Sequence, residues 1–296
     1  MAVSVLAESQ DKTIGDQAKY LVALAKPRLS TLVVFTAATG YGLAPGEHSF
    51  WIGVFTTVAT TILVASANAF NCYLEREHDA RMKRTEDRPF ATGKISPKFA
   101  LGFYGFFAAA AVPSLAYVVN PLTGLFGAIA FVTYVWIYTP LKYKSTSALF
   151  VGAVPGAAPP LMGYVAATGE ADAVGWLLFA VLFVWQLPHF LAISIYLRDD
   201  YERGGMKVFS LIHGFATARL AMVLTSLLLV LVGLLTVPLG VLSPLWGIIG
   251  AVPGLVLTWL TLKGFLEKAG DLWARKVFLA TLVYLPLFLA IWALGS

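Results

Sequence analysis

Nine long apolar stretches, separated by short polar segments, run through this chain of 296 residues. Each stretch has roughly 18–25 residues, the length with which an α-helix crosses the hydrocarbon core of a bilayer. Hydrophobic residues make up 58% of the sequence and charged residues only 12%, which is too little polar surface for a soluble protein. The sequence therefore predicts an all-α integral membrane protein. Its nine expected spans lie near residues 22–44, 51–74, 99–119, 121–140, 147–167, 174–196, 215–237, 243–264 and 275–294.

The 21 Lys and Arg residues lie at one side of the predicted membrane. The polar segments that follow the first, third, fifth and seventh spans contain none of them. By the positive-inside rule, we expect the N-terminus in the cytoplasm and the C-terminus outside. The net charge of +5 follows from this bias and by itself indicates no nucleic-acid partner. We expect a multi-pass protein of a bacterial inner membrane, with residues 1–20 as a cytoplasmic tail and residues 21–296 as one transmembrane domain.

A row of oxygen-bearing side chains ends the second expected span. Asn71, Glu75 and Asp79 follow one another at intervals of four residues, so on a helix they share one face. Amide and carboxylate oxygens are ligands of hard cations such as Mg²⁺. Basic side chains that could bind phosphate follow directly. They are Arg81, Lys83, Arg84 and Arg88. The pattern favours a metal and phosphate site, and salt bridges among these same side chains are the alternative.

A second polar cluster lies at the same side of the membrane, after the sixth expected span. It contains Asp200, which occupies the place in the second half of the chain that Asp79 occupies in the first. His189 and Tyr196 precede it at helical spacing. A histidine inside an apolar span is costly and usually faces a cavity or a partner helix. We therefore expect His189 to face a functional cavity.

With these motifs the chain resembles the UbiA superfamily of intramembrane prenyltransferases. The usual first motif of that superfamily is Asn-x-x-x-Asp-x-x-x-Asp, which here reads Asn71-x-x-x-Glu75-x-x-x-Asp79. Within the superfamily, the chain is most similar to the branch that farnesylates haem, over nearly its whole length from Lys26 onward. The segments that carry this similarity are 83–89, 138–142, 156–163, 185–190 and 199–201.

The resemblance implies nine helices around a central cavity that opens to the cytoplasm and the lipid. Its substrates would be farnesyl diphosphate and haem b (protohaem IX), with Mg²⁺ as cofactor. The farnesyl group would pass to a vinyl group of haem b with addition of water, giving haem O and diphosphate. Because haem O is the precursor of haem A in terminal oxidases, haem A synthase is the partner enzyme that this reading implies.

The resemblance also assigns roles to residues. The metal ligands would be Asn71, Glu75, Asp79 and, for a second site, Asp200. His189 and Tyr196 would complete the catalytic set, and Lys142 would join the four basic residues after Asp79 in binding diphosphate. The second motif of the superfamily usually has further aspartates, where this chain has His189 and Tyr196. This departure indicates a metal site that depends mainly on the first motif.

Two other functions fit parts of the pattern. The same fold could prenylate 4-hydroxybenzoate or a naphthoate in quinone biosynthesis, although segment 185–190 favours haem. A transporter of an anionic metabolite would also place Asn, Gln and His within spans. However, the polar groups gather at one side of the membrane, whereas transport requires access from both sides.

Overall fold

The structure is a computed structural model, and it describes residues 13–296. In this part of the chain all regular structure is helical, and eight helices are long and apolar enough to cross a membrane. They are α3 (Phe50–Leu74), α5 (Pro97–Ser114) with its π-helical continuation η1 (Leu115–Val119), α6 (Pro121–Val132) with η2 (Thr133–Tyr138) and α7 (Thr139–Leu141), α8 (Ala148–Thr168), α9 (Ala173–Tyr196), α11 (Phe209–Leu234), α12 (Pro244–Leu266) and α13 (Asp271–Gly295). The all-α membrane fold predicted from the sequence is confirmed.

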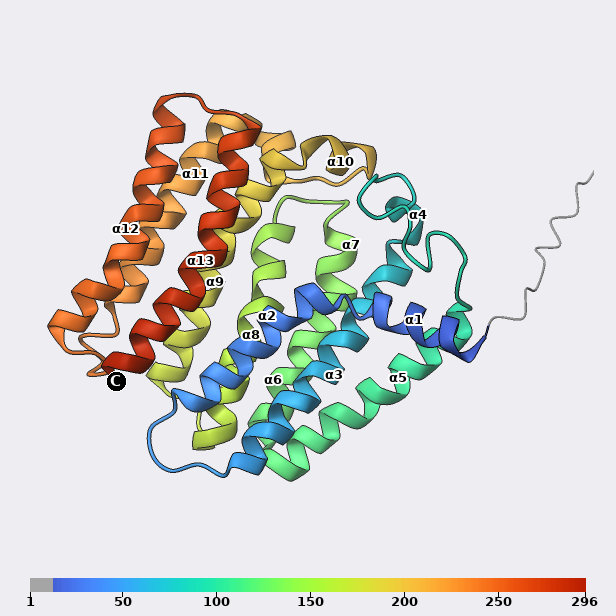
Figure 1. The fold of residues 1–296 in the computed structure, drawn as a ribbon, viewed down its shortest axis with the longest axis horizontal. Coiled ribbons are helices and arrows are strands. Elements are labelled where there is room, and N and C mark those ends of the chain that lie inside the picture. The colour runs from blue at the N-terminus through green and yellow to red at the C-terminus, as the bar shows by residue number, and fades with distance from the viewer. Residues whose placement is uncertain (1–12) are drawn as a thin grey trace, which may run out of the picture.

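The first expected span is shorter in the structure than in the sequence pattern. Lys26 adopts a left-handed conformation (φ 51°) and separates α1 (Ile14–Leu24) from α2 (Pro27–Gly42). The 16 residues of α2 fall below the roughly 20 that a perpendicular span requires. α2 nevertheless packs against α3 and α8 within the bundle (Figure 1). α1 crosses the expected boundary at residue 20, and residues 1–12 of the expected tail lie outside the described part.

The helices form two groups that meet along α8 and α9 (Figure 1). α2, α3, α5, α6 and α8 make up the first group, and α9, α11, α12 and α13 make up the second. The second group surrounds the largest apolar core, which includes Trp185, Tyr284 and Phe288. The interface between the groups is therefore where the two polar clusters predicted from the sequence can meet.

Side-chain caps fix the turns between helices at the end without basic residues. Asn120 accepts a hydrogen bond from the N–H of Thr123 (2.9 Å), directly before Pro121 in the first turn of α6. Asp172 accepts from the N–H of Val174 (2.9 Å) at the start of α9. Such caps satisfy backbone donors that helix starts leave unpaired, so the chain can reverse direction within a few residues.

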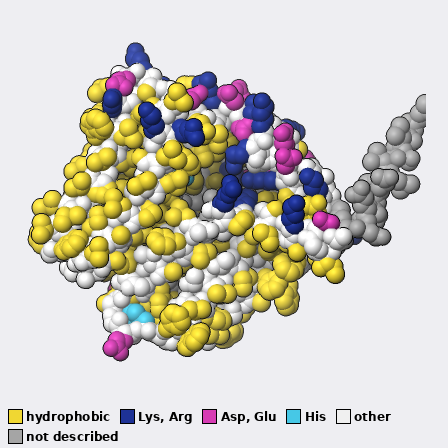
Figure 2. Space-filling view, in the orientation of Figure 1, with side chains coloured by type: hydrophobic (Ala, Val, Ile, Leu, Met, Phe, Trp, Pro, Cys, Tyr) yellow, Lys and Arg dark blue, Asp and Glu magenta, His cyan; other side chains and the backbone are white. Residues whose placement is uncertain are grey.

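Basic side chains gather at the opposite end of the bundle. On the face shown in Figure 2, Lys and Arg cluster where Figure 1 places α1, α4 (Arg76–Asp79) and α10 (Arg198–Arg203). The remaining surface of that face is mostly hydrophobic (Figure 2), and many large apolar side chains along the spans are exposed. This division agrees with the sidedness expected from the sequence, in which one end of the bundle carries the charged groups.

Glycine allows α2 and α8 to approach closely. A Cβ atom on Gly163 of α8 would overlap the carbonyl oxygen of Ala37, and one on Gly40 of α2 would overlap that of Pro160. Backbones can come this near only where no side chain intervenes, as is common between membrane helices. This contact holds the short α2 in the bundle.

We expect the Gly163→Ala variant to destabilise the fold by about 1–3 kcal/mol, because an overpacked contact must separate α2 from α8. Thermal unfolding of the purified protein in detergent measures this effect. Gly102→Ala in α5 is the matched control, since a Cβ there meets no described atom within 4 Å and alanine favours helix. A Gly163→Ala protein as stable as the control would contradict the packing role.

Candidate active site

The polar row at the end of α3 keeps the single face predicted for it. α4 continues α3 with little interruption, because the N–H of Glu75 donates to the carbonyl of Asn71 (3.0 Å) and that of Asp79 to the carbonyl of Glu75 (2.7 Å). The exposed fractions of Asn71, Glu75 and Asp79 are 1%, 2% and 0%. Buried carboxylates are costly unless they are paired, so their neighbours decide what this row can do.

The first two members of the row contact lysines from other segments. The Lys26 Nζ donates to the Asn71 Oδ1 (2.6 Å), and the Asn71 amide donates to the Thr139 hydroxyl (2.9 Å). Glu75 forms an ion pair with Lys142, which directly follows α7. Three segments distant in the sequence, at residues 26, 71–75 and 139–142, thus converge on the row.

The third member of the row is paired with arginine. The Arg88 Nη1 donates to both carboxylate oxygens of Asp79 (2.8 Å each), and the Thr85 hydroxyl donates to the Asp79 carbonyl (3.0 Å). The other basic candidates of this loop have exposed side chains and no ion pair within the described part of the chain. They are Arg81, Lys83 and Arg84. The acidic and basic groups therefore form the salt bridges that the sequence left open as an alternative.

Burial and pairing act in opposite directions on these charges. Burial alone raises the pKa of Glu75, but the positive charges of Lys142, Lys26 and Arg88 bring that pKa below its usual value. Burial lowers the pKa of Lys142, and the Glu75 carboxylate more than reverses this, so that the pKa is raised. Both partners are therefore charged at neutral pH. The Tyr143 hydroxyl is buried beside Glu75.

Asp200 of α10 binds the loop that follows α4. Its carboxylate accepts from the backbone N–H groups of Lys83 and Arg84 (3.3 Å each) and forms an ion pair with Arg203. Burial raises the pKa of Asp200, but Arg203 and the two N–H groups bring it below its usual value. The predicted neighbourhood of the two acidic clusters is present, with the backbone of the first cluster bound by the carboxylate of the second.

Two further contacts join α10 to the same loop. The His78 Nδ1 donates to the carbonyl of Gly204 (2.8 Å), and the His78 ring stacks on Tyr143 with 3.7 Å between ring centroids. Met82 is buried against Gly204, where a Cβ atom would lie 2.8 Å from the Met82 sulfur. Together these contacts fix α10 on the loop, so the position of each depends on the other.

His189 and Tyr196 both contact α13, and the His189 ring also lies against Trp185 and Phe190 of its own helix. The His189 Nδ1 and the Thr281 hydroxyl are 2.8 Å apart, and the His189 ring lies 4.7 Å from that of Phe278. The Arg275 guanidinium lies 5.8 Å from the centre of the Tyr196 ring. The structure joins neither side chain to the Asn71–Asp79 row. A polar residue this deep in a span faces either a cavity or a partner helix. The hydrogen bond to Thr281 corresponds to the second of these alternatives.

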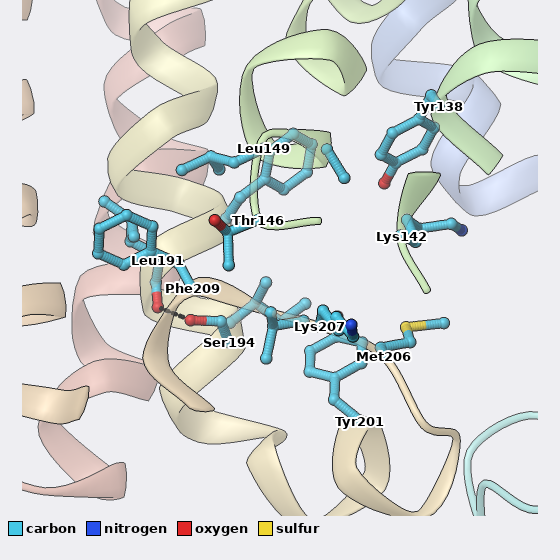
Figure 3. Close-up of a pocket in the computed structure, with 14 residues that line it drawn as sticks. Tyr138, Lys142, Thr146, Leu149, Leu191, Ser194, Tyr201, Met206, Lys207 and Phe209 are labelled. Atoms are coloured by element: carbon cyan, nitrogen blue, oxygen red, sulfur yellow. Dashed lines mark hydrogen bonds between the residues drawn. The ribbon is translucent and has the colours of Figure 1, made fainter. Parts of the chain in front are cut away.

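A cavity of about 90 Å³ lies beside the row (Figure 3). Lys142 and Tyr138 line it, so it adjoins the Glu75 ion pair directly. Several residues at this site were not candidates from the sequence; they are Lys26, Thr139, Tyr143, Tyr201 and Lys207. The one available signal was Lys26 before Pro27, where a lysine precedes a helix start within an apolar stretch.

Comparison with known proteins identifies the family. The model of the UbiA prenyltransferase family matches residues 33–292. The chain belongs to this family. Protoheme IX farnesyltransferase of Anaeromyxobacter sp. (strain Fw109-5) is 53% identical over 279 residues, which cover 94% of each chain. The protein of the same name from Anaeromyxobacter dehalogenans (strain 2CP-C) is 49% identical over 274 residues, 92% of each chain.

Solved structures share the fold of this UbiA family member. A digeranylgeranylglyceryl phosphate synthase matches with a TM-score of 0.80 at 15% identity, over 95% of this chain and 98% of the other. A UbiA homolog from Archaeoglobus fulgidus bound to GPP and Mg²⁺ matches with a TM-score of 0.62 at 14% identity, over 92% and 99%. At these identities the likeness establishes the arrangement of the helices.

The donor atoms of the row suit a hard cation. Amide and carboxylate oxygens are the preferred ligands of Mg²⁺, and Asn71, Glu75 and Asp79 present such oxygens in a buried row. Within residues 13–296, no three His, Cys, Asp or Glu side chains are grouped as a metal site in the present arrangement. A cation that binds at the row must therefore displace Lys142 from the Glu75 carboxylate and Arg88 from the Asp79 carboxylate. Both basic groups would then be unpaired.

Variants of the Glu75–Lys142 pair can separate its contribution to the stability of this UbiA family member from its contribution to catalysis. We expect Lys142→Met alone to lower the free energy of unfolding by about 3–5 kcal/mol, because it leaves a buried carboxylate uncompensated. The double variant Glu75→Gln/Lys142→Met should recover most of that stability, since neither charge remains. Thermal unfolding in detergent measures both.

The prenyl-transfer activity of these variants should not recover when their stability recovers. We expect the double variant to remain without prenyl-transfer activity, because both charged groups of the row are lost. A double variant that regains activity along with stability would show that the pair serves the fold alone.

Proposed function

We propose that this chain transfers the farnesyl group of farnesyl diphosphate to a vinyl group of haem b, with addition of water, giving haem O and diphosphate. The observation that carries the proposal is the 53% identity to a protoheme IX farnesyltransferase across 94% of both chains. The match extends over 279 of the 296 residues, so it is not confined to one part of the chain.

The buried charges support a diphosphate site at the row. Lys26, Lys142 and Arg88 bring three cations to Asn71, Glu75 and Asp79. We assign Asn71, Glu75 and Asp79 to Mg²⁺, which when bound would neutralise the diphosphate and assist its departure. Once their acidic partners bind the metal, the released basic groups would be free to bind phosphate oxygens. The same side chains thus serve as counterions in one state and as substrate ligands in the other.

The reaction breaks the bond between farnesyl and diphosphate, opens the vinyl double bond and one O–H bond of water, and forms one C–C bond and one C–O bond. The bond between C1 of the farnesyl group and its diphosphate oxygen breaks, and the electron pair leaves with the diphosphate. C1 bonds to the terminal carbon of the haem vinyl group, which places the positive charge on the carbon next to the porphyrin. Water then adds its oxygen to that carbon and loses one proton, giving a hydroxyl group.

Aromatic faces beside the row could stabilise the cationic carbon. Tyr138 and Phe190 line the cavity, and the Lys142 Nζ lies 4.9 Å from the centre of the Tyr138 ring. Trp136 is 57% exposed, and the Trp185 Nε1 donates to the Thr281 carbonyl (2.7 Å). An aromatic face is worth about 0.5–2 kcal/mol to a cation. Tyr138 is the ring best placed for this role.

The membrane placement belongs to the same proposal. With α2 as a ninth crossing, the N-terminus and the site lie in the cytoplasm and Ser296 lies outside, in the inner membrane of a bacterium. The concentration of basic side chains at the α4 and α10 end supports this orientation (Figure 2). Farnesyl diphosphate could then enter with its tail in the lipid and its head group at the loops.

The direct test incubates the purified enzyme in detergent with haem b, farnesyl diphosphate and Mg²⁺, and analyses the products by mass spectrometry. We expect a haem that carries the hydroxyethylfarnesyl group, and we expect it to be lost when EDTA removes the metal. If the enzyme instead prenylates 4-hydroxybenzoate or a naphthoate and gives no haem product, the proposed acceptor is wrong, although the family and the fold still hold.

Asp200 provides a second test, because its contacts indicate a role different from metal binding. We propose that it positions the loop that carries Arg84 and Arg88. Asp200→Asn should raise the KM for farnesyl diphosphate about tenfold, as expected for the loss of a charged hydrogen-bond acceptor. The Mg²⁺ concentration for half-maximal rate should stay unchanged.

The exposed neighbour Asp199 supplies the matched control, since Asp199→Asn removes the same charge without touching the loop. Steady-state rates at varied substrate and varied Mg²⁺ separate the two roles. If Asp200→Asn needs a much higher Mg²⁺ concentration for half-maximal rate, Asp200 is a metal ligand, as the sequence predicted, and the positioning role is wrong.

A further inference from the structure

The cavity beside the row is contiguous with the place where diphosphate would leave. Lys142 and Tyr138 form its wall on that side, and Lys142 is the partner of Glu75 (Figure 3). A prenyl acceptor must approach the carbon that carries the diphosphate within bond-forming distance. The cavity therefore lies where an acceptor has to be.

The lining of the cavity is amphipathic. Leu149 of α8, Leu191 of α9 and Phe209 of α11 supply apolar walls. Thr146 and Lys207 from loops and Tyr201 from α10 supply polar groups (Figure 3). Haem b has matching chemistry, because its ring is flat and apolar and its two propionates lie along one edge. An aromatic acid of one or two rings would need less apolar wall and carries a single carboxylate.

Lys207 is a cation without a counterion in the described part of the chain. Its side chain is exposed at the rim of the cavity, and it belongs to no recorded ion pair. Its backbone N–H donates to the Lys142 carbonyl (2.8 Å), which places it next to the Glu75–Lys142 pair in this closed arrangement. Lys142, by contrast, already forms an ion pair with Glu75.

We infer that this cavity is the acceptor site and that Lys207 binds a propionate of haem b. The inference rests on the function proposed above and adds the place and the anchor of the second substrate. The basic end of the pocket holds the carboxylate edge, and the apolar walls hold the ring. A vinyl group of the porphyrin then faces Tyr138 and the farnesyl carbon.

One wall of the cavity must move to admit a porphyrin. Ligand pockets usually measure about 300–1,000 Å³, whereas this cavity measures about 90 Å³. The wall segment 206–213 lies between Gly205 (φ +69°) and Gly214 (φ +79°), two positions where glycine allows a backbone that other residues rarely adopt. A hydrogen bond between Thr146 and His213 (3.1 Å) closes this segment onto the loop after α7. Lys207 lies on the movable wall and would close over the bound propionate.

The test titrates the purified full-length enzyme in detergent with haem b, without farnesyl diphosphate, and follows the Soret band of the haem. Lys207→Met should raise the Kd for haem b about fivefold, the upper range for one solvent-exposed charge pair. Its Kd for the dimethyl ester of haem b should equal that of the wild type, because the ester has no carboxylate to lose. Lys98→Met, an exposed lysine at the start of α5, is the control and should bind haem b like the wild type.

A second variant tests the cavity itself. Leu149→Trp fills the space from α8 and should abolish haem binding while the affinity for farnesyl diphosphate stays normal, which also reports an intact fold. Equal haem affinity of Lys207→Met and wild type, in an enzyme that makes haem O, would overturn this inference and leave the proposed function standing. An enzyme that binds no haem and prenylates an aromatic acid would overturn both.

Discussion

The burial of three polar side chains in a row at the end of α3 is the constraint on which the rest of this site depends. Glu75 and Asp79 are charged and have almost no exposed surface, and a buried charge requires a partner. The partners come from three separate segments of the chain, and they are Lys26, Lys142 and Arg88. The left-handed turn at Lys26 and the loop after α7 are therefore held in place by the same charges that suit a metal and a diphosphate.

The second acidic cluster acts on the first through the backbone. Asp200 accepts from two N–H groups of the loop after α4, and His78 donates to the carbonyl at Gly204. A carboxylate used in this way fixes a loop, and the loop carries exposed Arg84 and partly buried Arg88. The two helical groups are thereby joined at their charged end, in addition to the packing of α8 on α9. Movement of one group relative to the other would therefore displace the loop that we propose binds diphosphate.

The sequence predicted the helices well and the partners of the charged residues poorly, for a physical reason. Length and apolarity determine a membrane span locally, so eight spans follow from the pattern. Spacing by four placed Asn71, Glu75 and Asp79 on one face for the same reason. A pairing such as Lys26 with Asn71 is set by packing between distant segments, and no local pattern contains it. For His189, its depth in α9 showed that the residue is unusual. The sequence could not tell whether it faces a cavity or a partner helix, and in the structure it contacts Thr281 of α13.

Internal pairing also explains why the charged end can attract anionic substrates. The buried pairs cancel one another, so they add little to the field outside the protein. Exposed cations at this end that form no ion pair within the described residues include Arg81, Lys83, Arg84 and Lys207. Both proposed substrates are amphiphiles with anionic groups, and an excess of one sign around a low-dielectric site raises the local concentration of the opposite sign. Under the proposed function, the acidic row would select what is bound, and the exposed cations would raise the local concentration of anionic substrates.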